Sequence, residues 1–327
     1  MQDSVQAVAP SWVEKIQGSV DEFWQRVRRG QKGWVTGFRR LDDALCGLQP
    51  GFHIIAGESN LGKSLFLNQL AWQVAVLNPD VHVMDITIDD SEYEKYCRLL
   101  AHLAGVEINM VKRYGQVQLL LPEVTERIEA AYRRLKGMAW RYEVVDGTSI
   151  GDINQLSELI HQRLLDIRAL SEPMELAVFI DSFHDVAPEE DKNNGLNPYE
   201  YTAKAISDLA NEHDIAIVCT AELKKLGGHR RPIVDDIRES VKIRYKAKSI
   251  LLCYNEVSAR GEEAEVYYER TNRPGKFPIL EVHVAKNKFN SFKGRLCFEF
   301  WPELALLVEP NDTDHAQYLK MIRTKAM

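Results

Sequence analysis

The sequence predicts an α/β fold in which a mainly parallel central sheet is flanked by helices. The first indication is a glycine-bearing loop at residues 57–64, between a short apolar run at 52–56 and a segment at 65–75 whose apolar residues recur at helical spacing. The second is residues 176–181, a fully apolar run that ends in Asp181. Central parallel strands are buried on both faces and therefore read as uninterrupted apolar runs of this kind.

The loop at residues 57–64 matches the phosphate-binding pattern G-x-x-x-x-G-K-[ST] at every fixed position, with the strand before it and the helix after it that the pattern requires. In such a loop, backbone N–H groups surround the β-phosphate, and the helix points its positive end at it. Lys63 would reach the β- and γ-phosphates, and the Ser64 hydroxyl would ligate Mg²⁺. We therefore expect ATP and Mg²⁺ as cofactors. The expected nucleotide-binding residues are Gly57, Glu58, Ser59, Asn60, Leu61, Gly62, Lys63, Ser64 and Leu65.

Composition indicates a globular protein with one large α/β domain or two ordinary ones. Of 327 residues, 45% are hydrophobic and 27% are charged, and the formal net charge is −7. A chain with this charge does not coat nucleic acid as a polycation, so any nucleic-acid site would be a local basic surface such as the inside of a ring. The five cysteines are scattered without a C-x-x-C pair, which favours reduced thiols in a cytoplasmic protein over disulfides or a zinc site. No apolar segment is long enough to span a membrane, and the N-terminus has no signal-peptide core.

The first 33 residues are expected to contain one amphipathic helix. Residues 1–10 look disordered, after which Ser11 and Glu14 form a capping box. Apolar residues then recur at helical spacing up to about Gly30, namely Val13, Ile16, Val20, Phe23, Trp24 and Val27. The helix could pack on its own domain, or it could be a linker helix that docks on a neighbouring subunit, and the sequence leaves both interpretations open.

Residues 34–52 carry a more specific pattern. They read T-G-F-x-x-L-D and then G-L-x-P-G, followed by the apolar strand and the phosphate loop. This order resembles the ATPase domain of DnaB-type replicative helicases, and KaiC-like members of the wider RecA class share a looser version of it. The resemblance covers about residues 34–309 and implies a RecA-like P-loop ATPase domain at 34–310, after an N-terminal segment at 1–33 and before a short polar tail at 311–327. It also implies that the helical collar domain of these helicases is absent, since only 33 residues precede the ATPase domain.

Two carboxylates follow expected strands in this scheme. The strand at residues 81–88 ends at Asp89, where the resembled family has a glutamate that polarises the attacking water. The apolar run at 176–181 has the shape of a Walker B strand, and its Asp181 would hold the hydration shell of Mg²⁺. Between the two carboxylates the chain reads mostly as helices, expected at 92–104, about 122–136 and 150–169, with a strand at 142–146 and with Ser149 or Asp152 as the cap of the last helix.

Two loops correspond to the DNA-binding loops of RecA-class motors. The first, residues 184–200, is acidic and has Lys192 as its single lysine, which argues against contact with phosphates. The second, residues 224–232, is basic and bears glycines, and it would contact single-stranded DNA through Lys224, Lys225, Arg230 and Arg231. The alternative is that this charge run is simply a solvated surface.

The remaining family elements lie in the last third of the chain. A helix at 201–213 and a strand at 215–220 precede Glu222, where the family has a glutamine that senses the γ-phosphate. Lys286 and Lys288 stand where the family has a Lys-x-Arg pair that is donated to the ATP of the adjacent subunit. The other expected elements are a D-L-R-E-S-like segment at 235–240, strands at 249–254, 280–289 and 294–300, and a hairpin-like region at 270–275.

Asp89, Glu222 and Lys288 depart from the family pattern. Aspartate is one methylene shorter than glutamate, and a misplaced catalytic group of this kind can cost about 100-fold in rate. Glu222 would repel the γ-phosphate unless a cation such as Lys286 or Lys288 offsets its charge. Lys288 keeps the charge of arginine but lacks its bidentate fork.

Two functions from different classes follow. The first is a ring-forming, ATP-dependent DNA helicase or translocase, most simply an ATP-promoted hexamer on single-stranded DNA, with replication or mobile-element proteins as candidate partners. Its catalytic residues would be Lys63, Asp89, Asp181, Glu222, Lys286 and Lys288. The second is a nucleotide-dependent assembly or regulatory switch ATPase that does not unwind DNA, which the altered catalytic positions and the acidic first loop favour.

Overall fold

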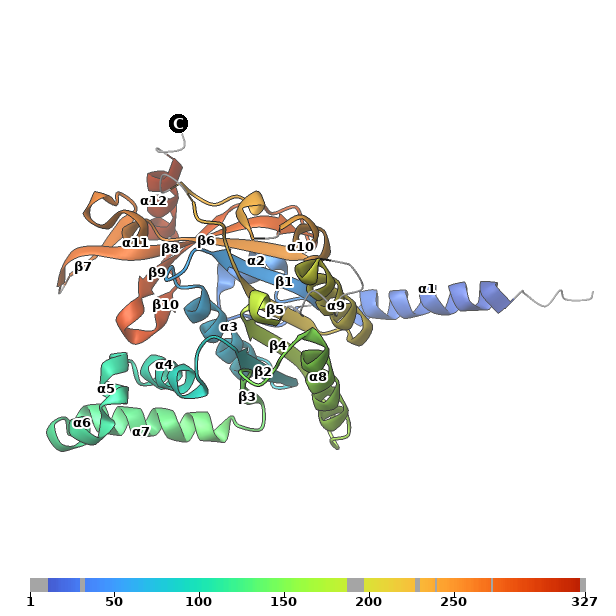
Figure 1. Ribbon diagram of the computed structural model, residues 1–327, viewed down its shortest axis with the longest axis horizontal. Helices are drawn as coiled ribbons and strands as arrows, with labels where there is room; N and C mark the ends of the chain where they lie inside the picture. Colours follow the sequence, from blue (N-terminus) through green and yellow to red (C-terminus); the bar gives the residue numbers. More distant parts are fainter. Residues whose placement is uncertain are drawn as a thin grey trace, which may run out of the picture.

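The computed structural model describes residues 11–29, 33–186, 197–226, 230–238, 240–271 and 273–323. Within them a ten-stranded sheet has the order β10-β9-β8-β6-β1-β5-β4-β2-β3, with β7 paired to β8 (Figure 1). The strands are β1 Gly51–Gly57, β2 Val81–Thr87, β3 Tyr142–Asp146, β4 Glu175–Asp181, β5 Ala216–Glu222, β6 Ser249–Tyr254, β7 Tyr267–Arg270, β8 Arg273–Asn287, β9 Arg295–Trp301 and β10 Leu306–Val308. The expected disorder of residues 1–10 and the centre of the acidic loop, residues 187–196, lie outside the described residues, as do 227–229 and Glu239.

The centre of the sheet is parallel, as the sequence predicts. Strands β6, β1, β5, β4, β2 and β3 run parallel to their neighbours, whereas β8, β9 and β10 continue the sheet in antiparallel pairing. Every residue of β1 and β2 is buried. Neighbouring residues of β1 enter different cores, with Ile54 in one and Ile55 in the other, because successive side chains of a strand point to opposite faces.

Helices cover both faces of the sheet and enclose these two cores (Figure 1). One core contains buried residues of α2 and α3, and the other contains buried residues of α8, α9 and α10. The helices are α1 Ser11–Arg29, α2 Arg39–Leu45, α3 Lys63–Leu77, α4 Glu92–Ala104, α5 Ile108–Lys112, α6 Tyr114–Leu120, α7 Pro122–Gly137, α8 Ile153–Arg168, α9 Pro198–His213, α10 Ser240–Lys246, α11 Glu256–Arg260 and α12 Asp312–Arg323. Short 3₁₀ turns are η1 Phe183–Val186, η4 Val234–Asp236, η5 Gly261–Glu263 and η6 Pro302–Leu304. The described helices include none that is long and apolar enough to cross a membrane.

Several element boundaries differ from the expectation by a few residues. Helix α9 begins at Pro198 rather than at Tyr201, because the Asn197 side chain accepts a hydrogen bond from the Tyr199 N–H at 3.0 Å and caps the helix there. Strand β8 begins at Arg273, where it pairs with β7 before it joins the main sheet. Of the two proposed caps of α8, Asp152 is the one observed.

The predicted helix α1 is confirmed, and its apolar face is exposed. Trp12 and Phe23 are each 62% exposed, and Ile16, Val20, Trp24 and Val27 are between 48% and 57% exposed. Figure 1 shows α1 projecting away from the sheet and its covering helices. The structure therefore does not support the interpretation in which this helix packs on its own domain.

The expectation of a polar tail from residue 311 is wrong for α12. This helix is polar in composition, but Tyr318 and Ile322 lie one turn apart and are buried at 6% and 4% exposure against the sheet face beside β9. The Tyr318 hydroxyl also donates to a Glu299 oxygen at 2.9 Å. Two apolar positions one turn apart are too weak a pattern to predict a packed helix.

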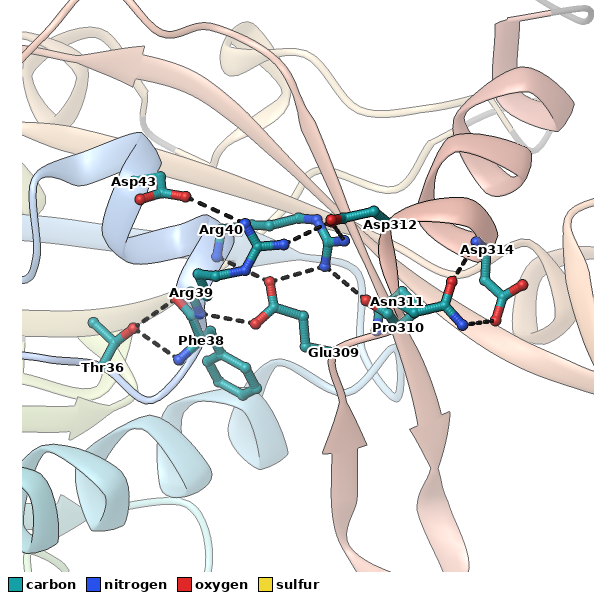
Figure 2. Close-up of polar contacts among 10 residues, drawn as sticks. All are labelled: Thr36, Phe38, Arg39, Arg40, Asp43, Glu309, Pro310, Asn311, Asp312 and Asp314. Atoms are coloured by element: carbon teal, nitrogen blue, oxygen red, sulfur yellow. Dashed lines mark hydrogen bonds and ion pairs between the residues drawn. The ribbon is translucent and has the colours of Figure 1, made fainter.

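The segment before α12 caps helix α2 (Figure 2). The α2 N-cap residue, Phe38, provides no side-chain cap, and the Glu309 carboxylate accepts hydrogen bonds from the backbone N–H groups of Arg39 and Arg40 at 2.8 and 2.9 Å. Arg40 also donates to Glu309 through its guanidinium at 3.0 Å, and Asp312 pairs with both arginines. A carboxylate at a helix N-terminus satisfies free N–H groups and complements the helix dipole.

We predict that Glu309→Ala lowers the free energy of unfolding by about 1–2 kcal/mol, the usual effect of losing a helix cap. Urea denaturation of the full chain measures this change. Asp43→Ala is the matched control, since Asp43 belongs to the same cluster but is 72% exposed and lies 3.8 Å from Arg39. The control should change the stability by less than about 0.5 kcal/mol. Equal losses in the two variants would contradict the capping role.

Candidate functional site

The phosphate loop leaves the N-terminus of α3 without a side-chain cap. Strand β1 ends at Gly57, and the loop turns through Asn60 at φ 63° and Gly62 at φ 102°. Gly62 is the N-cap of the 15-residue helix α3 and offers no side-chain acceptor to the first N–H groups of the helix. A Cβ at Gly62 would lie 3.1 Å from the Phe300 ring and would require a left-handed backbone, so glycine is needed here. The free N–H groups and the helix dipole together form an anion-binding end.

A cavity of about 590 Å³ lies over this helix end, at the carboxyl edge of the parallel strands. Lys63, Ser64, Asp89, Asp181 and Glu222 all line it, although they come from separate segments of the chain. Its size is within the range of small-molecule sites. The structure thus brings together five of the residues that the sequence selects.

Lys63 is held inside the loop that precedes it. Its ammonium donates to the Glu58 carbonyl at 2.8 Å. Burial lowers the pKa of Lys63, and the nearby Asp181 and Glu222 oppose that shift. A partly buried lysine whose ammonium has no ion pair among the described residues is suited to receive a phosphate, because the anion replaces the hydration that burial removes.

Asp181 and Ser64 are the groups that could hold a divalent cation. Asp181 ends β4, is 9% exposed and accepts a hydrogen bond from the Thr220 hydroxyl, which orients its carboxylate. The described residues contain no group of three or more His, Cys, Asp or Glu side chains arranged to bind a metal. Mg²⁺ is commonly bound by only one or two protein groups, with nucleotide phosphates and water completing its shell. The donors present fit that mode.

Asp89 lies among other carboxylates in the same cavity. Burial raises its pKa, and repulsion from Asp185, Asp90 and Asp181 adds to the increase. Asp90, one residue later, is paired with Arg98 of α4. The sequence analysis did not predict this pair. The available signals were an acid next to the catalytic candidate Asp89 and an arginine eight residues later in the expected helix.

Glu222 is neutralised by Arg238 rather than by either lysine that we expected. An Arg238 guanidinium nitrogen lies 2.9 Å from a Glu222 oxygen, and Arg238 also lines the cavity. Lys286 and Lys288 of the same chain do not offset the charge of Glu222, and an offset by the lysines of an adjacent subunit stays a prediction. Arg238 belongs to the segment at 235–240 that resembles the family element, but its partner could not be read from the sequence.

His184 is a second residue that the sequence analysis did not select. Its Nδ1 accepts a hydrogen bond from the Glu222 N–H at 3.3 Å, which leaves the proton of the neutral ring on Nε2. Burial lowers the pKa of His184 and favours this neutral form. Its Nε2 is buried without a partner among the described residues, and the ring lines the cavity. A histidine three residues after Asp181 was the available signal.

Lys286 and Lys288 lie away from this cavity. Strand β8 is antiparallel to β6, and Asn287 pairs with Ser249, the first residue of β6. The two lysines are therefore at the edge where the parallel strands begin, whereas the phosphate loop follows the end of β1. Lys286 donates to the Arg244 carbonyl, and burial together with Lys288 lowers its pKa to about 8.

The four cations selected for DNA contact are separated by the structure. Lys224 and Lys225 are exposed and line a second cavity of about 720 Å³ beside the first. Arg230 makes two hydrogen bonds of 2.6 Å with Asp236. Arg231 pairs with the buried Glu281 and Glu256 and lies over the Tyr254 ring. Two of the four cations thus form ion pairs with acidic residues of the same chain.

Comparison with known proteins places these features in context. The family model described as the DnaB-like helicase C-terminal domain matches residues 33–304. One solved structure, described as an ATPase domain, is 18% identical with a TM-score of 0.76, covering 90% of this chain and 99% of that one. Another, described as a DnaB-like replicative helicase and its interactions with primase, is 18% identical with a TM-score of 0.73, covering 89% of this chain and 66% of that one. No curated protein matches the chain.

We predict that Lys63→Ala weakens ATP binding by about 10- to 150-fold, because a hydrogen bond to a charged group contributes about 1.5–3 kcal/mol. A titration with a fluorescent ATP analogue measures this. The control is Lys204→Ala, which removes an exposed lysine of α9 that pairs with its helix neighbour Asp208. Asp181→Asn should reduce the gain in affinity that Mg²⁺ confers. Parent affinity in Lys63→Ala would show that the nucleotide binds elsewhere.

Proposed function

Because the chain belongs to the family of DnaB-like helicase C-terminal domains, we propose that it is a Mg²⁺-dependent ATPase that assembles into a ring and moves along single-stranded DNA. One observation carries the proposal. Lys63, Ser64 and Asp181 surround an uncapped helix end at one edge of the sheet, while Lys286 and Lys288 lie at the opposite edge. A second copy of the chain can bring to its neighbour's cavity these two lysines, which do not line the cavity of their own chain.

In this proposal, the bound ATP supplies the phosphoryl group to be transferred. Lys63 and the N–H groups of α3 hold its phosphates, and Ser64 and Asp181 hold the magnesium ion. Asp89, whose pKa is raised by burial and by neighbouring carboxylates, orients the attacking water. The neutral His184, which lines the cavity, donates through its Nε2–H to an oxygen on the γ-phosphate side, beside the paired Glu222 and Arg238.

The exposed face of α1 supports assembly. Six large apolar side chains on one helix, each at least 48% exposed, are costly in water. A neighbouring subunit is the partner that would cover them in a ring, and this fits the linker-helix interpretation of the sequence. With Lys286 and Lys288 reaching the neighbour's ATP, nucleotide binding would favour the ring, which we propose to be a hexamer.

The DNA contact is proposed for Lys224 and Lys225. They are exposed, whereas Arg230 and Arg231 already neutralise Asp236, Glu281 and Glu256. Two cations per subunit bind weakly alone, and binding becomes appreciable when the loops of several subunits meet on one strand.

The alternative is a nucleotide-dependent assembly or switch protein that does not unwind DNA. The Glu222–Arg238 pair favours it specifically, because a sensor carboxylate that is held by an arginine cannot act as the neutral amide of the family pattern does. Under this alternative, ATP would drive ring assembly but DNA would not accelerate hydrolysis.

The deciding experiment is ATP hydrolysis with and without single-stranded DNA. We predict stimulation by DNA in the parent, and its loss in the double variant Lys224→Glu, Lys225→Glu, since reversed charges repel the phosphates. DNA affinity should fall with salt, by about 0.7 in the log–log slope for each neutralised phosphate. Lys112→Glu, Lys204→Glu is the matched control, with two lysines reversed on other surfaces. An unstimulated parent that still assembles with ATP would favour the switch protein.

Lys286→Ala tests the contact between subunits. We predict that it lowers ATP hydrolysis at least about tenfold at saturating ATP, because the neighbour's transition state loses a cation. ATP affinity measured on dilute monomer should change much less, since Lys286 is remote from its own phosphate loop. Light scattering with and without ATP reports assembly. A parent that stays monomeric at all concentrations of protein and ATP would exclude the ring.

A further inference from the structure

The two cavities of the site share a wall. Ser59, Glu222 and Arg238 line both the 590 Å³ cavity over the phosphate loop and the 720 Å³ cavity beside it. The second cavity is also lined by Glu58, Lys224 and Lys225. The proposed nucleotide and DNA contacts are therefore neighbours in space, although about 160 residues separate them in the chain.

Glu58 contacts both sides of this arrangement. One of its carboxylate oxygens accepts a hydrogen bond from the Leu226 N–H at 3.0 Å, across 168 residues of chain. Its backbone carbonyl accepts from the Lys63 ammonium at 2.8 Å. One residue of the phosphate loop thus touches the lysine that faces the phosphates and the segment that carries the exposed cations.

The basic segment at residues 224–226 is held at two points. At its start, Leu223 pairs with Ile237, and the Lys224 N–H donates to the Asp236 carbonyl at 2.7 Å. At its other described end, Leu226 is held by Glu58. Lys224 and Lys225 lie between these points with exposed side chains. The Glu58 contact therefore sets where the second half of the segment lies.

A glutamate is an unexpected choice at this position. The phosphate-loop pattern places no demand on its second residue, and a carboxylate near bound phosphates is repelled by them. Glu222 and Asp181 already contribute negative charge close to Lys63. The contact with Leu226 accounts for a side-chain oxygen acceptor at this position.

We propose that Glu58 is a positioning residue that couples the phosphate loop to the basic segment at residues 224–226. A phosphate competes for the Lys63 ammonium, so the Glu58 carbonyl loses its donor, and the backbone and carboxylate of Glu58 shift together. Through Leu226 that shift moves Lys224 and Lys225, so that the affinity for a phosphodiester backbone depends on the nucleotide. This inference rests on the proposed function and names how its two sites communicate.

The test compares three variants of the full chain. Glu58→Gln keeps an oxygen that can accept from Leu226, Glu58→Ala removes it, and Glu58→Asp keeps the charge but is one methylene too short. The measured quantity is the ratio of the Kd for oligo-dT without nucleotide to that with a non-hydrolysable ATP analogue, with saturation established separately for each variant. Glu172→Ala, which removes an exposed glutamate at the far edge of the sheet, is the control.

We expect a ratio of at least about fivefold, the lower end of typical coupling, in the parent, Glu58→Gln and Glu172→Ala. It should fall to about one in Glu58→Ala and Glu58→Asp. If Glu58→Asp keeps the ratio while Glu58→Gln loses it, charge rather than the hydrogen bond is responsible, and the proposal is wrong. A parent ratio retained in Glu58→Ala also overturns it.

Hydrogen–deuterium exchange of the peptide that contains Leu226 separates this inference from the proposed function. Adding the ATP analogue should change that exchange in the parent and in Glu58→Gln, but not in Glu58→Ala. A change with this pattern in a protein that binds no DNA would support the coupling and refute the DNA function. The same nucleotide-dependent change in the parent and in Glu58→Ala, or none in the parent, would refute the coupling itself.

Discussion

The arrangement of the site depends on the N-terminus of α3. Its first backbone N–H groups have no side-chain acceptor, because the N-cap residue is Gly62. Free N–H groups at a helix end bind anions, and here they face a cavity rather than a protein side chain. A helix end can bind an anion in this way only if the loop before it keeps its conformation. Strand β1, buried along its whole length between two cores, holds the loop at the edge of the sheet. The α3 helix behind the loop is itself largely buried.

The second organising feature is the way in which charge is distributed around that cavity. Carboxylates outnumber lysines and arginines in its wall, and their repulsion contributes to the raised pKa of Asp89. Cations from other segments balance part of this charge, with Arg98 on Asp90 and Arg238 on Glu222. Arg230 and Arg231 are likewise paired with acids of the chain, Asp236 and Glu281. Lys224 and Lys225 are exposed and line the second cavity, which shares Ser59, Glu222 and Arg238 with the nucleotide cavity.

Topology explains why a single copy is incomplete under the proposed function. Because β8 runs against β6, Lys286 and Lys288 emerge where the parallel strands begin. The phosphate loop emerges where β1 ends. Side chains at opposite edges of one sheet cannot meet within a chain, but they can meet between copies arranged head to tail, the heterologous contact from which rings are built. The exposed apolar face of α1 fits the same arrangement.

The sequence by itself determined what depends on neighbours in the chain. The phosphate loop, the apolar runs of β1 and β4 and the helical spacing of α1 and α3 are local patterns, and each formed where it was predicted. The family pattern at residues 34–52 likewise pointed to the fold that the comparisons show. Only the tertiary structure decided which charges meet. Glu222 forms an ion pair with Arg238, and Arg231 forms one with Glu281. The Glu58 carboxylate accepts a hydrogen bond from the Leu226 N–H. The packing of α12 was hidden for the same reason, since its two buried residues have meaning only beside β9. Periodicity encodes which face of an element is buried, but it does not encode which element will lie opposite, and a charged side chain pairs with whatever the fold places within about 3 Å of it.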